Sequence, residues 1–377
     1  MHIKTPADFF ETIYRRTIKP EDHILINTVF SLPPTQKMLS ECLRVCDIEA
    51  MRIHHKILML SYLAHDYPEL DFSEYAGPRL AGLIRFYRFA NIKLFVHLSR
   101  IGKALDAAGI PILLLKGGAM KVLRPAFSRS MGDIDILVPN NAFSKAFTIC
   151  EGLGYRDAHM GAPHSIDLLD QKGASCLDIH WKILSFGNDT AFCKALFTRA
   201  RPMVVSGIRL LLPAPEDLFF MLLINLEKNL REETSLHSFF FSLIDSRFLL
   251  FENGPFNWEI VKENINKTGA FYQTRMAAEF INTLVPGLIP EMEKHFLWNT
   301  KTKKKAANSW NKTVFGRDVI EPKAAACRKI TVWELKQKPL FYGLKILKFL
   351  ILKNLWSFPF VIRRHLTTRG YVVYNAG

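Results

Sequence analysis

Three carboxylates in the middle of the chain have the types and spacing of a metal site. Asp133 and Asp135 belong to residues 133–138, where acids alternate with isoleucines, and Asp178 lies in the similar stretch 175–181. Both stretches indicate strands, and residues two apart on a strand share a face, so Asp133 and Asp135 point the same way. Adjacent carboxylates repel each other unless a cation lies between them. The sequence therefore predicts a metal-binding site formed by Asp133, Asp135 and Asp178.

Magnesium bound to triphosphate oxygens is the expected occupant of this site, because Mg²⁺ prefers a few carboxylates together with phosphate and water oxygens. With Asp178 on a neighbouring strand, the three carboxylates would hold two Mg²⁺ ions. One ion would activate an attacking hydroxyl, and the other would stabilise the leaving pyrophosphate. An NTP is therefore the expected substrate.

Candidate nucleotide-binding residues precede the paired aspartates. The apolar run 110–115 indicates a buried strand, and it ends in Lys116, Gly117 and Gly118 ahead of a short helix expected at 119–123. Glycines let the backbone approach phosphate closely at the start of a helix, where free N–H groups favour anions. Lys116 would neutralise triphosphate charge, or it is an ordinary surface cation.

Arg129 and His180 complete the expected nucleotide site. Arg129 is a second candidate cation for the triphosphate, with ordinary surface charge as the alternative. His180 shares a strand face with Asp178 and would orient that carboxylate or contact the base; a structural, half-buried histidine is the alternative. Asp245 is expected to make a polar contact between helices. The chain has no G-x-x-x-x-G-K-[ST] motif and no zinc-type histidine spacing, which disfavours P-loop kinases and zinc enzymes.

The elements expected around these residues form an α+β fold. Apolar residues at helical spacing dominate the first hundred residues and the segment from Pro215 to about Trp298, whereas short strands dominate the part between them, including a hairpin at 203–212. We expect four parts: an N-terminal helical region at 1–95, a core with a small mixed sheet and helices at 96–212, a C-terminal helical domain at 213–298 and a basic tail at 299–377.

Composition narrows the class of protein. The 377 residues are 49% apolar and 23% charged, which is ordinary for a folded protein of about two or three domains. The six cysteines form no C-x-x-C pair, and we expect reduced thiols in the cytosol. The first residues lack the pattern of a signal peptide, and no apolar run is long enough to span a membrane. The expected location is the cytoplasm.

Positive charge is concentrated in the last fifth of the chain. From Lys294 to the C-terminus there are 18 Lys and Arg residues and three acidic residues, and the resulting +15 equals the formal charge of the whole chain. Residues 336–369 mix cations with bulky apolar side chains, some of which form a helical stripe (Leu340, Leu344, Leu347 and Ile351). We expect this segment to bind an anionic membrane surface, at the inner face of the membrane. Packing on the protein's own body is the main alternative, and nucleic acid is a weaker one.

Three stretches taken together resemble a known family. Residues 115–119 (Leu-Lys-Gly-Gly-Ala), 129–138 (Arg-Ser-Met-Gly-Asp-Ile-Asp-Ile-Leu-Val) and 177–181 (Leu-Asp-Ile-His-Trp) resemble the uncharacterised nucleotidyltransferase family of the DNA polymerase β-like superfamily. The resemblance implies a polymerase-β-like nucleotidyltransferase core in which the three aspartates are the metal ligands and the two glycines form the phosphate turn.

The resemblance also implies the reaction, which is transfer of a nucleoside monophosphate from an NTP to a hydroxyl group with release of pyrophosphate. An intermediate of peptide or glycan biosynthesis is a candidate acceptor. Two alternatives remain open. One is a non-catalytic, membrane-associated adaptor with the same fold, and the other is a nucleotidyltransferase acting on tRNA or another RNA, which the basic tail suggests.

Overall fold

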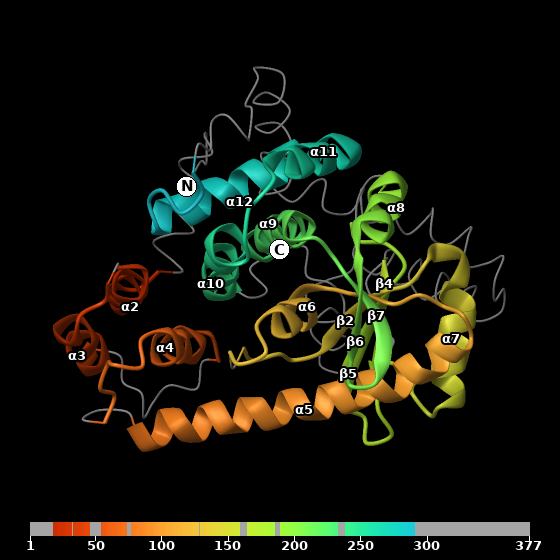
Figure 1. Cartoon of the computed structure of the whole chain (residues 1–377), viewed down its shortest axis with the longest axis horizontal. Helices are drawn as coiled ribbons and strands as arrows, with labels where there is room; N and C mark the ends of the chain where they lie inside the picture. The colour runs from red at the N-terminus through yellow and green to blue at the C-terminus, as the bar shows by residue number, and fades with distance from the viewer. Residues whose placement is uncertain are drawn as a thin grey trace, which may run out of the picture.

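The described part of the chain forms a mixed sheet surrounded by helices (Figure 1). The computed structural model describes residues 18–31, 33–45, 54–73, 77–127, 129–158, 164–184, 189–232 and 238–290. Within these residues there are eleven α-helices and seven strands, which confirms the α+β class expected from the sequence. The basic tail expected at 299–377, with its predicted membrane segment 336–369, lies outside the described residues.

One mixed sheet of seven strands lies at the centre of the fold, in the order β3-β4-β5-β2-β1-β7-β6. β2 and β5 are parallel, β1 and β7 are parallel, and the other neighbouring pairs are antiparallel. The bounds are β1 Leu113–Leu114, β2 Ile134–Leu137, β3 Arg156–Asp157, β4 Ser165–Leu169, β5 Ser175–His180, β6 Arg201–Val205 and β7 Ile208–Leu212.

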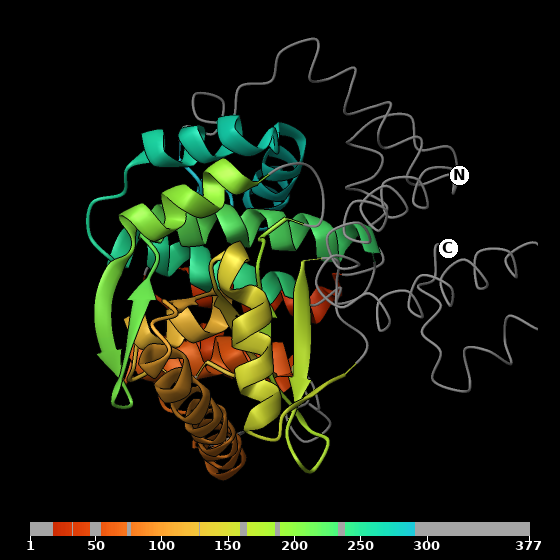
Figure 2. The same ribbon diagram turned by 90° about the vertical axis from the view of Figure 1, so that its right-hand side faces the viewer.

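The helices enclose this sheet and extend well beyond it (Figures 1 and 2). Their bounds are α2 Pro20–Phe30, α3 Gln36–Val45, α4 His54–Asp66, α5 Gly77–Ala107, α6 Lys116–Leu123, α7 Phe143–Gly152, α8 Thr190–Arg199, α9 Pro215–Glu232, α10 Phe239–Arg247, α11 Trp258–Thr268 and α12 Phe271–Leu284. A 3-10 turn, Asn140–Ala142, precedes α7, and a π-helical turn, Phe248–Glu252, follows α10.

The register of the two central strands gives the sheet two chemically different faces. Asp135 of β2 pairs with Asp178 of β5, and Leu137 pairs with His180, so these side chains share one side, the carboxylate face. The residues that alternate with them are buried and form the opposite, apolar face (Ile134, Ile136, Leu177 and Ile179). The ionisable side chains of β2 and β5 therefore lie on one side of the sheet, and the residues that alternate with them on the other side are apolar and buried.

Helix α5 covers the apolar face. Leu113 of β1 pairs with both Leu137 and Leu211, so Leu211 lies on the carboxylate face and Ile208, three residues earlier, lies on the apolar face. A Cβ added to Gly102 of α5 would lie 2.5 Å from the Ile208 side chain, so glycine lets α5 approach β7 closely. The carboxylate face is thus turned away from α5.

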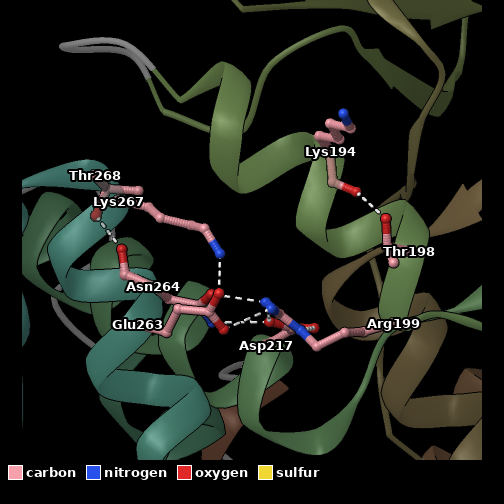
Figure 3. Close-up of polar contacts among 8 residues, drawn as sticks. All are labelled: Lys194, Thr198, Arg199, Asp217, Glu263, Asn264, Lys267 and Thr268. Carbon is pink, nitrogen blue, oxygen red and sulfur yellow. Dashed lines mark hydrogen bonds and ion pairs between the residues drawn. The ribbon is translucent and has the colours of Figure 1, made fainter.

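A buried ion-pair network joins α8, α9 and α11 (Figure 3). Arg199, at the end of α8, donates to both carboxylate oxygens of Asp217, from Nε at 3.1 Å and from Nη2 at 2.6 Å. The Asn264 amide donates to Asp217 at 2.8 Å and accepts from Arg199 at 2.7 Å. Glu263, which is exposed, lies 3.0 Å from Arg199 Nη1. Asp217 lies in the first turn of α9, which begins at Pro215 as the sequence predicted.

A second buried cluster joins α4 to the helices that follow the sheet. Arg124, at the end of α6, contacts Asp66 of α4 and lies 3.2 Å from Glu252. The Tyr62 hydroxyl donates to Glu252 at 3.2 Å, and the Arg124 guanidinium lies over the Tyr62 and Phe127 rings. Burial, followed by the negative charge of Glu252, raises the pKa of Tyr62, so its hydroxyl keeps its proton.

Two local features differ from the expectations. The short helix expected at 119–123 begins at Lys116, so the two glycines lie in its first turn rather than in a loop before it. Strands β3 and β4 form one edge of the sheet in a segment where the sequence predicted no strand. No helix within the described ranges combines the length and the apolar character needed to cross a membrane.

Candidate metal and nucleotide site

Asp135 and Asp178 lie side by side at the centre of the carboxylate face. They are direct partners in the parallel register of β2 and β5, and the Asp135 side chain is almost fully buried. Asp178 is partly exposed. Strand alternation alone places both carboxylates on the side opposite the buried isoleucines.

Asp133 lies immediately before β2, two residues from Asp135, and keeps an exposed surface. Loss of water around its carboxylate, followed by the negative charge of Asp135, raises the pKa of Asp133 to about 6. Asp178 and Asp167 raise this pKa further, and Lys116 opposes them. The carboxylates are therefore close enough to repel one another in the absence of a metal ion.

His180 and Lys116 neutralise part of this negative charge. His180 Nε2 lies 2.9 Å from Asp135 Oδ1 and 3.1 Å from Asp178 Oδ2, and the Lys116 ammonium contacts Asp135 Oδ1. Burial alone would lower the pKa of His180, but the charge of Asp178 and the hydrogen bond to Asp135 outweigh it and raise that pKa. Burial would likewise raise the pKa of Asp135, but Lys116 and His180 lower it well below its usual value.

Lys116 is held in an unusual backbone conformation. It is the first residue of α6 and has a φ of +40°, in the left-handed region that costs a residue other than glycine about 1 kcal/mol or more. Burial disfavours its ammonium, yet the charge of Asp135 raises the pKa of Lys116. The helix start thus aims a positive charge at the carboxylates.

The carboxylate cluster, which we define as Asp133, Asp135 and Asp178 with Lys116 and His180, contains unsatisfied polar atoms. Asp178 Oδ1 and His180 Nδ1 are buried, and no group in the described part of the chain hydrogen-bonds to either atom. Such atoms are costly unless a ligand satisfies them. Asp135, Asp178 and His180 each offer a ligand atom, and these atoms lie within 4.8 Å of one another. This group could hold a metal ion.

Gly117 and Arg129 form a separate contact beside the carboxylate cluster. A Cβ on Gly117 would collide with the Arg129 guanidinium, so glycine is required for Arg129 to lie where it does. The guanidinium stacks 4.9 Å from the centre of the Phe241 ring and forms an ion pair with Asp245, at 2.9 Å between Nη2 and Oδ2. Arg129 is therefore already neutralised by α10.

The expectation for Asp245 was wrong in one respect. The sequence predicted a contact between helices, but the partner of Asp245 is Arg129, in the loop before β2. Gly118 differs in its surroundings from Gly117, because a Cβ at position 118 would lie 2.8 Å from the Leu114 side chain. Packing therefore also favours a small residue at this position.

Sequence reasoning missed two residues on the carboxylate face. Asp167 of β4 is the register partner of Asp178, on the side away from Asp135, and is partly exposed. The His164 ring centre lies 5.4 Å from that of His180, and burial, followed by the charge of His180, lowers the pKa of His164 well below its usual value. The alternation of Ser165-Ile-Asp-Leu-Leu169 was the signal for Asp167, because it repeats the pattern of the two central strands.

Comparison with known proteins identifies the class of this molecule. A family model described as uncharacterised nucleotidyltransferase matches residues 51–286, and the chain belongs to this family. Membership supports a transferase and implies a nucleotide substrate. No curated protein matches the chain significantly. Among solved structures, an antigenic nucleotidyltransferase-like protein from Paracoccidioides brasiliensis is similar at 12% identity and a TM-score of 0.31, over 54% of this chain and 91% of that one.

Proposed function

We propose that the protein is a Mg²⁺-dependent enzyme that transfers a nucleoside monophosphate from an NTP to a hydroxyl group and releases pyrophosphate, on a polymerase-β-like nucleotidyltransferase core. The observation that carries the proposal is the direct register pairing of Asp135 with Asp178, with Asp133 two residues away and exposed. Family membership supports the same class of reaction.

In this proposal Asp133, Asp135 and Asp178 hold two Mg²⁺ ions. The residues fit a hard cation, because carboxylate oxygens are its preferred ligands and Asp178 Oδ1 has no hydrogen-bond partner among the described groups. Bound Mg²⁺ would supply charge stabilisation for the attacking hydroxyl and the leaving pyrophosphate. The chain itself contributes positioning and fixed charge, which are the main requirements of phosphoryl-type transfer.

His180 and Lys116 have separate roles in this arrangement. His180 is more deeply buried than the two paired carboxylates and contacts both, so it would hold their oxygens in fixed directions, as residues behind metal ligands do. Lys116 is partly exposed, so its ammonium can move from Asp135 to a triphosphate oxygen when cations bind the carboxylates.

The first turn of α6 would bind the triphosphate. Helices leave their first N–H groups unpaired, and Gly117 and Gly118 lie at this end of α6 next to Lys116. Arg129 remains part of the proposed nucleotide site because its guanidinium lies against Gly117. Its positive charge also forms an ion pair with Asp245. An NTP bound here would lie next to the carboxylate cluster.

We also propose a cytoplasmic location with peripheral attachment to an anionic membrane through residues 336–369, and an intermediate of peptide or glycan biosynthesis as the acceptor.

The division into parts at 1–95, 96–212, 213–298 and 299–377 stays a prediction. Helix α5, Gly77–Ala107, continues through the first of these boundaries.

The reaction is tested by incubating the protein with each NTP, Mg²⁺ and candidate acceptors, including peptide and glycan intermediates and tRNA. Mass spectrometry should find an acceptor heavier by one nucleoside monophosphate, together with pyrophosphate. Asp135→Asn should lower the rate by roughly 10²-fold or more, whereas Asp106→Asn, the same change at an exposed ion pair on α5, should not. Tight partner binding with no turnover for any NTP would favour the adaptor alternative.

A further inference from the structure

Helix α5 is the longest described helix and lies along one edge of the molecule (Figures 1 and 2). Its 31 residues run from the N-terminal helices to α7 without a break. The inner side is buried against the rest of the protein (Leu80, Tyr87, Leu94, Leu98, Ile101 and Leu105). The outer side has no such packing against the other described residues, and its composition is unusual.

Four large apolar side chains point outward from α5, three or four residues apart, so each lies about one helical turn from the next. Phe86, Phe89, Ile92 and Val96 are exposed by 61%, 59%, 60% and 62%, respectively. Single exposed apolar residues are ordinary, but a continuous row of them marks a surface that binds something. From Phe86 to Val96 the row covers ten residue steps, or about 15 Å of helix at 1.5 Å per residue. We call these four residues the outer stripe.

The charged residues of α5 next to the outer stripe are all positive. Between Gly77 and Leu105 the chain has six Lys and Arg residues and no Asp or Glu. Of these, Arg85, Lys93 and Lys103 are exposed, and no carboxylate of the described residues pairs with them. The one acid of α5, Asp106, lies 3.1 Å from Arg209 and is already neutralised. The outer stripe and the cations beside it thus form a surface that is both apolar and positively charged.

We propose that the outer stripe of α5 is a docking surface for an anionic lipid bilayer. Apolar side chains of an interfacial helix enter the boundary between headgroups and acyl chains, while Lys and Arg extend to anionic headgroups. A long helix at the edge of the molecule can lie flat on a membrane surface, which needs no concave groove to receive it. Lys93 fits this placement, because its ammonium lies 5.0 Å from the centre of the Phe89 ring and shares its exposed surface.

Charge argues against two other occupants of the stripe. A second copy of this chain would place the same cations against each other across a symmetric contact. The basic segment from Lys294 to the C-terminus has a net charge of +15, so it also repels this surface. An acidic protein remains, and the experiment below separates it from lipid.

Docking through α5 would orient the molecule. Because α5 covers the apolar face of the sheet, docking would turn the carboxylate face away from the bilayer. The inference is independent of the proposed reaction, since membrane binding can be measured without nucleotide.

The test is cosedimentation of the full-length protein with vesicles of neutral phosphatidylcholine and with vesicles containing phosphatidylserine. Changing Phe86, Phe89, Ile92 and Val96 together to Gln should lower partitioning onto anionic vesicles by roughly tenfold or more, with an unchanged melting temperature because the four side chains are exposed. Changing Arg85, Lys93 and Lys103 to Gln should give a loss of similar size. A control with Phe251→Gln and Phe271→Gln, two exposed residues on other elements, should bind as the wild type does.

Each other outcome contradicts the proposal. Wild-type binding by the stripe variant would mean that α5 contributes nothing to membrane association and that another part of the chain, such as 336–369, carries it alone. Equal binding of the wild type to both kinds of vesicle would remove the role of the cations. A wild-type dimer that becomes monomeric in the stripe variant, by sedimentation velocity, would make the stripe a protein interface.

Discussion

Asp133 and Asp135 are two residues apart, yet their surroundings move their pKa values in opposite directions. Asp135 is buried beside Lys116 and His180, which lower its pKa, whereas loss of water and the charge of Asp135 raise the pKa of Asp133 to about 6. The positive charges of Lys116 and His180 therefore compensate Asp135, whereas the carboxylate of Asp133 is left for a ligand. Divergent pKa values of neighbouring groups are common at functional sites.

The raised pKa of Asp133 predicts a pH-dependent gain from Asp133→Asn in the metal-free protein. The folded state keeps the Asp133 proton up to about pH 6, whereas the unfolded chain releases it near 3.8, so the contribution of Asp133 to stability falls as pH rises between these values. Above pH 6 the variant, which lacks the repelling charge, should be more stable than the wild type. The difference should shrink as pH falls below 6.

This difference is measured by urea unfolding in EDTA across pH 4–8 for both proteins. With Mg²⁺ and an NTP analogue the order should reverse above pH 6, because the wild type alone gains the full ligand stabilisation. A stability difference that does not change with pH would mean that Asp133 does not sense the neighbouring carboxylates.

At the scale of single elements, helices α8, α9 and α11 are fixed to one another by charge as well as by packing. Asp217, at the start of α9, is fully buried and is bound by Arg199 and Asn264. Glu263 binds the same guanidinium from the solvent side and is about half exposed. The two carboxylates thus share a partner and differ in burial.

The difference in burial predicts very different losses of folding stability when each of these two carboxylates is replaced by its amide. Asp217→Asn should destabilise the protein by about 3–5 kcal/mol, because Arg199 loses its largely buried partner. Glu263→Gln should cost no more than about 1 kcal/mol, because the pair is open to water. Urea unfolding of both variants measures the two free energies. Equal losses would show that the network is weaker than its geometry indicates.

The elements were predictable from sequence where a simple period dominated. Acid and isoleucine alternate at the start of the stretch 133–138, which contains β2, and polar residues alternate with apolar ones in Leu177-Asp-Ile-His-Trp181, at the end of β5. Strands β3 and β4 carried a weaker signal, because β3 has two residues and β4 contains a register shift at Leu168 and Leu169. The start of α6 was missed because two glycines favour a turn locally, while tertiary packing allows them in a helix.

The same limits apply to the candidate site. Alternation was enough to place Asp135 beside Asp178, since register follows from two parallel strands. It could not place Arg129, whose ion pair with Asp245 joins positions 116 residues apart and depends on how α10 packs. Asp167 was not predicted because its strand, β4, was not predicted. His164 was not predicted because its contact with His180 joins two separate segments of the chain.

At the scale of the whole molecule, the chain separates its two surfaces of interest. The carboxylate cluster lies on one face of the sheet, and α5 covers the other and carries the outer stripe. Helix α5 also joins the N-terminal helices to the sheet, so the parts cannot be cut apart at residue 95 without cutting a helix. Substitutions therefore test this molecule better than truncations within the described residues.

The most direct test of the account is the location of metal ions in crystals grown with Mn²⁺ and a non-hydrolysable NTP analogue. Anomalous scattering should place one ion between Asp135 and Asp178 and a second beside Asp133, with carboxylate oxygens at about 2.1 Å, as for Mg²⁺. The triphosphate should lie at the first turn of α6, with Lys116 moved from Asp135 to a phosphate oxygen. Mn²⁺ and nucleotide bound elsewhere, with Lys116 and His180 still in contact with Asp135, would contradict the proposed site.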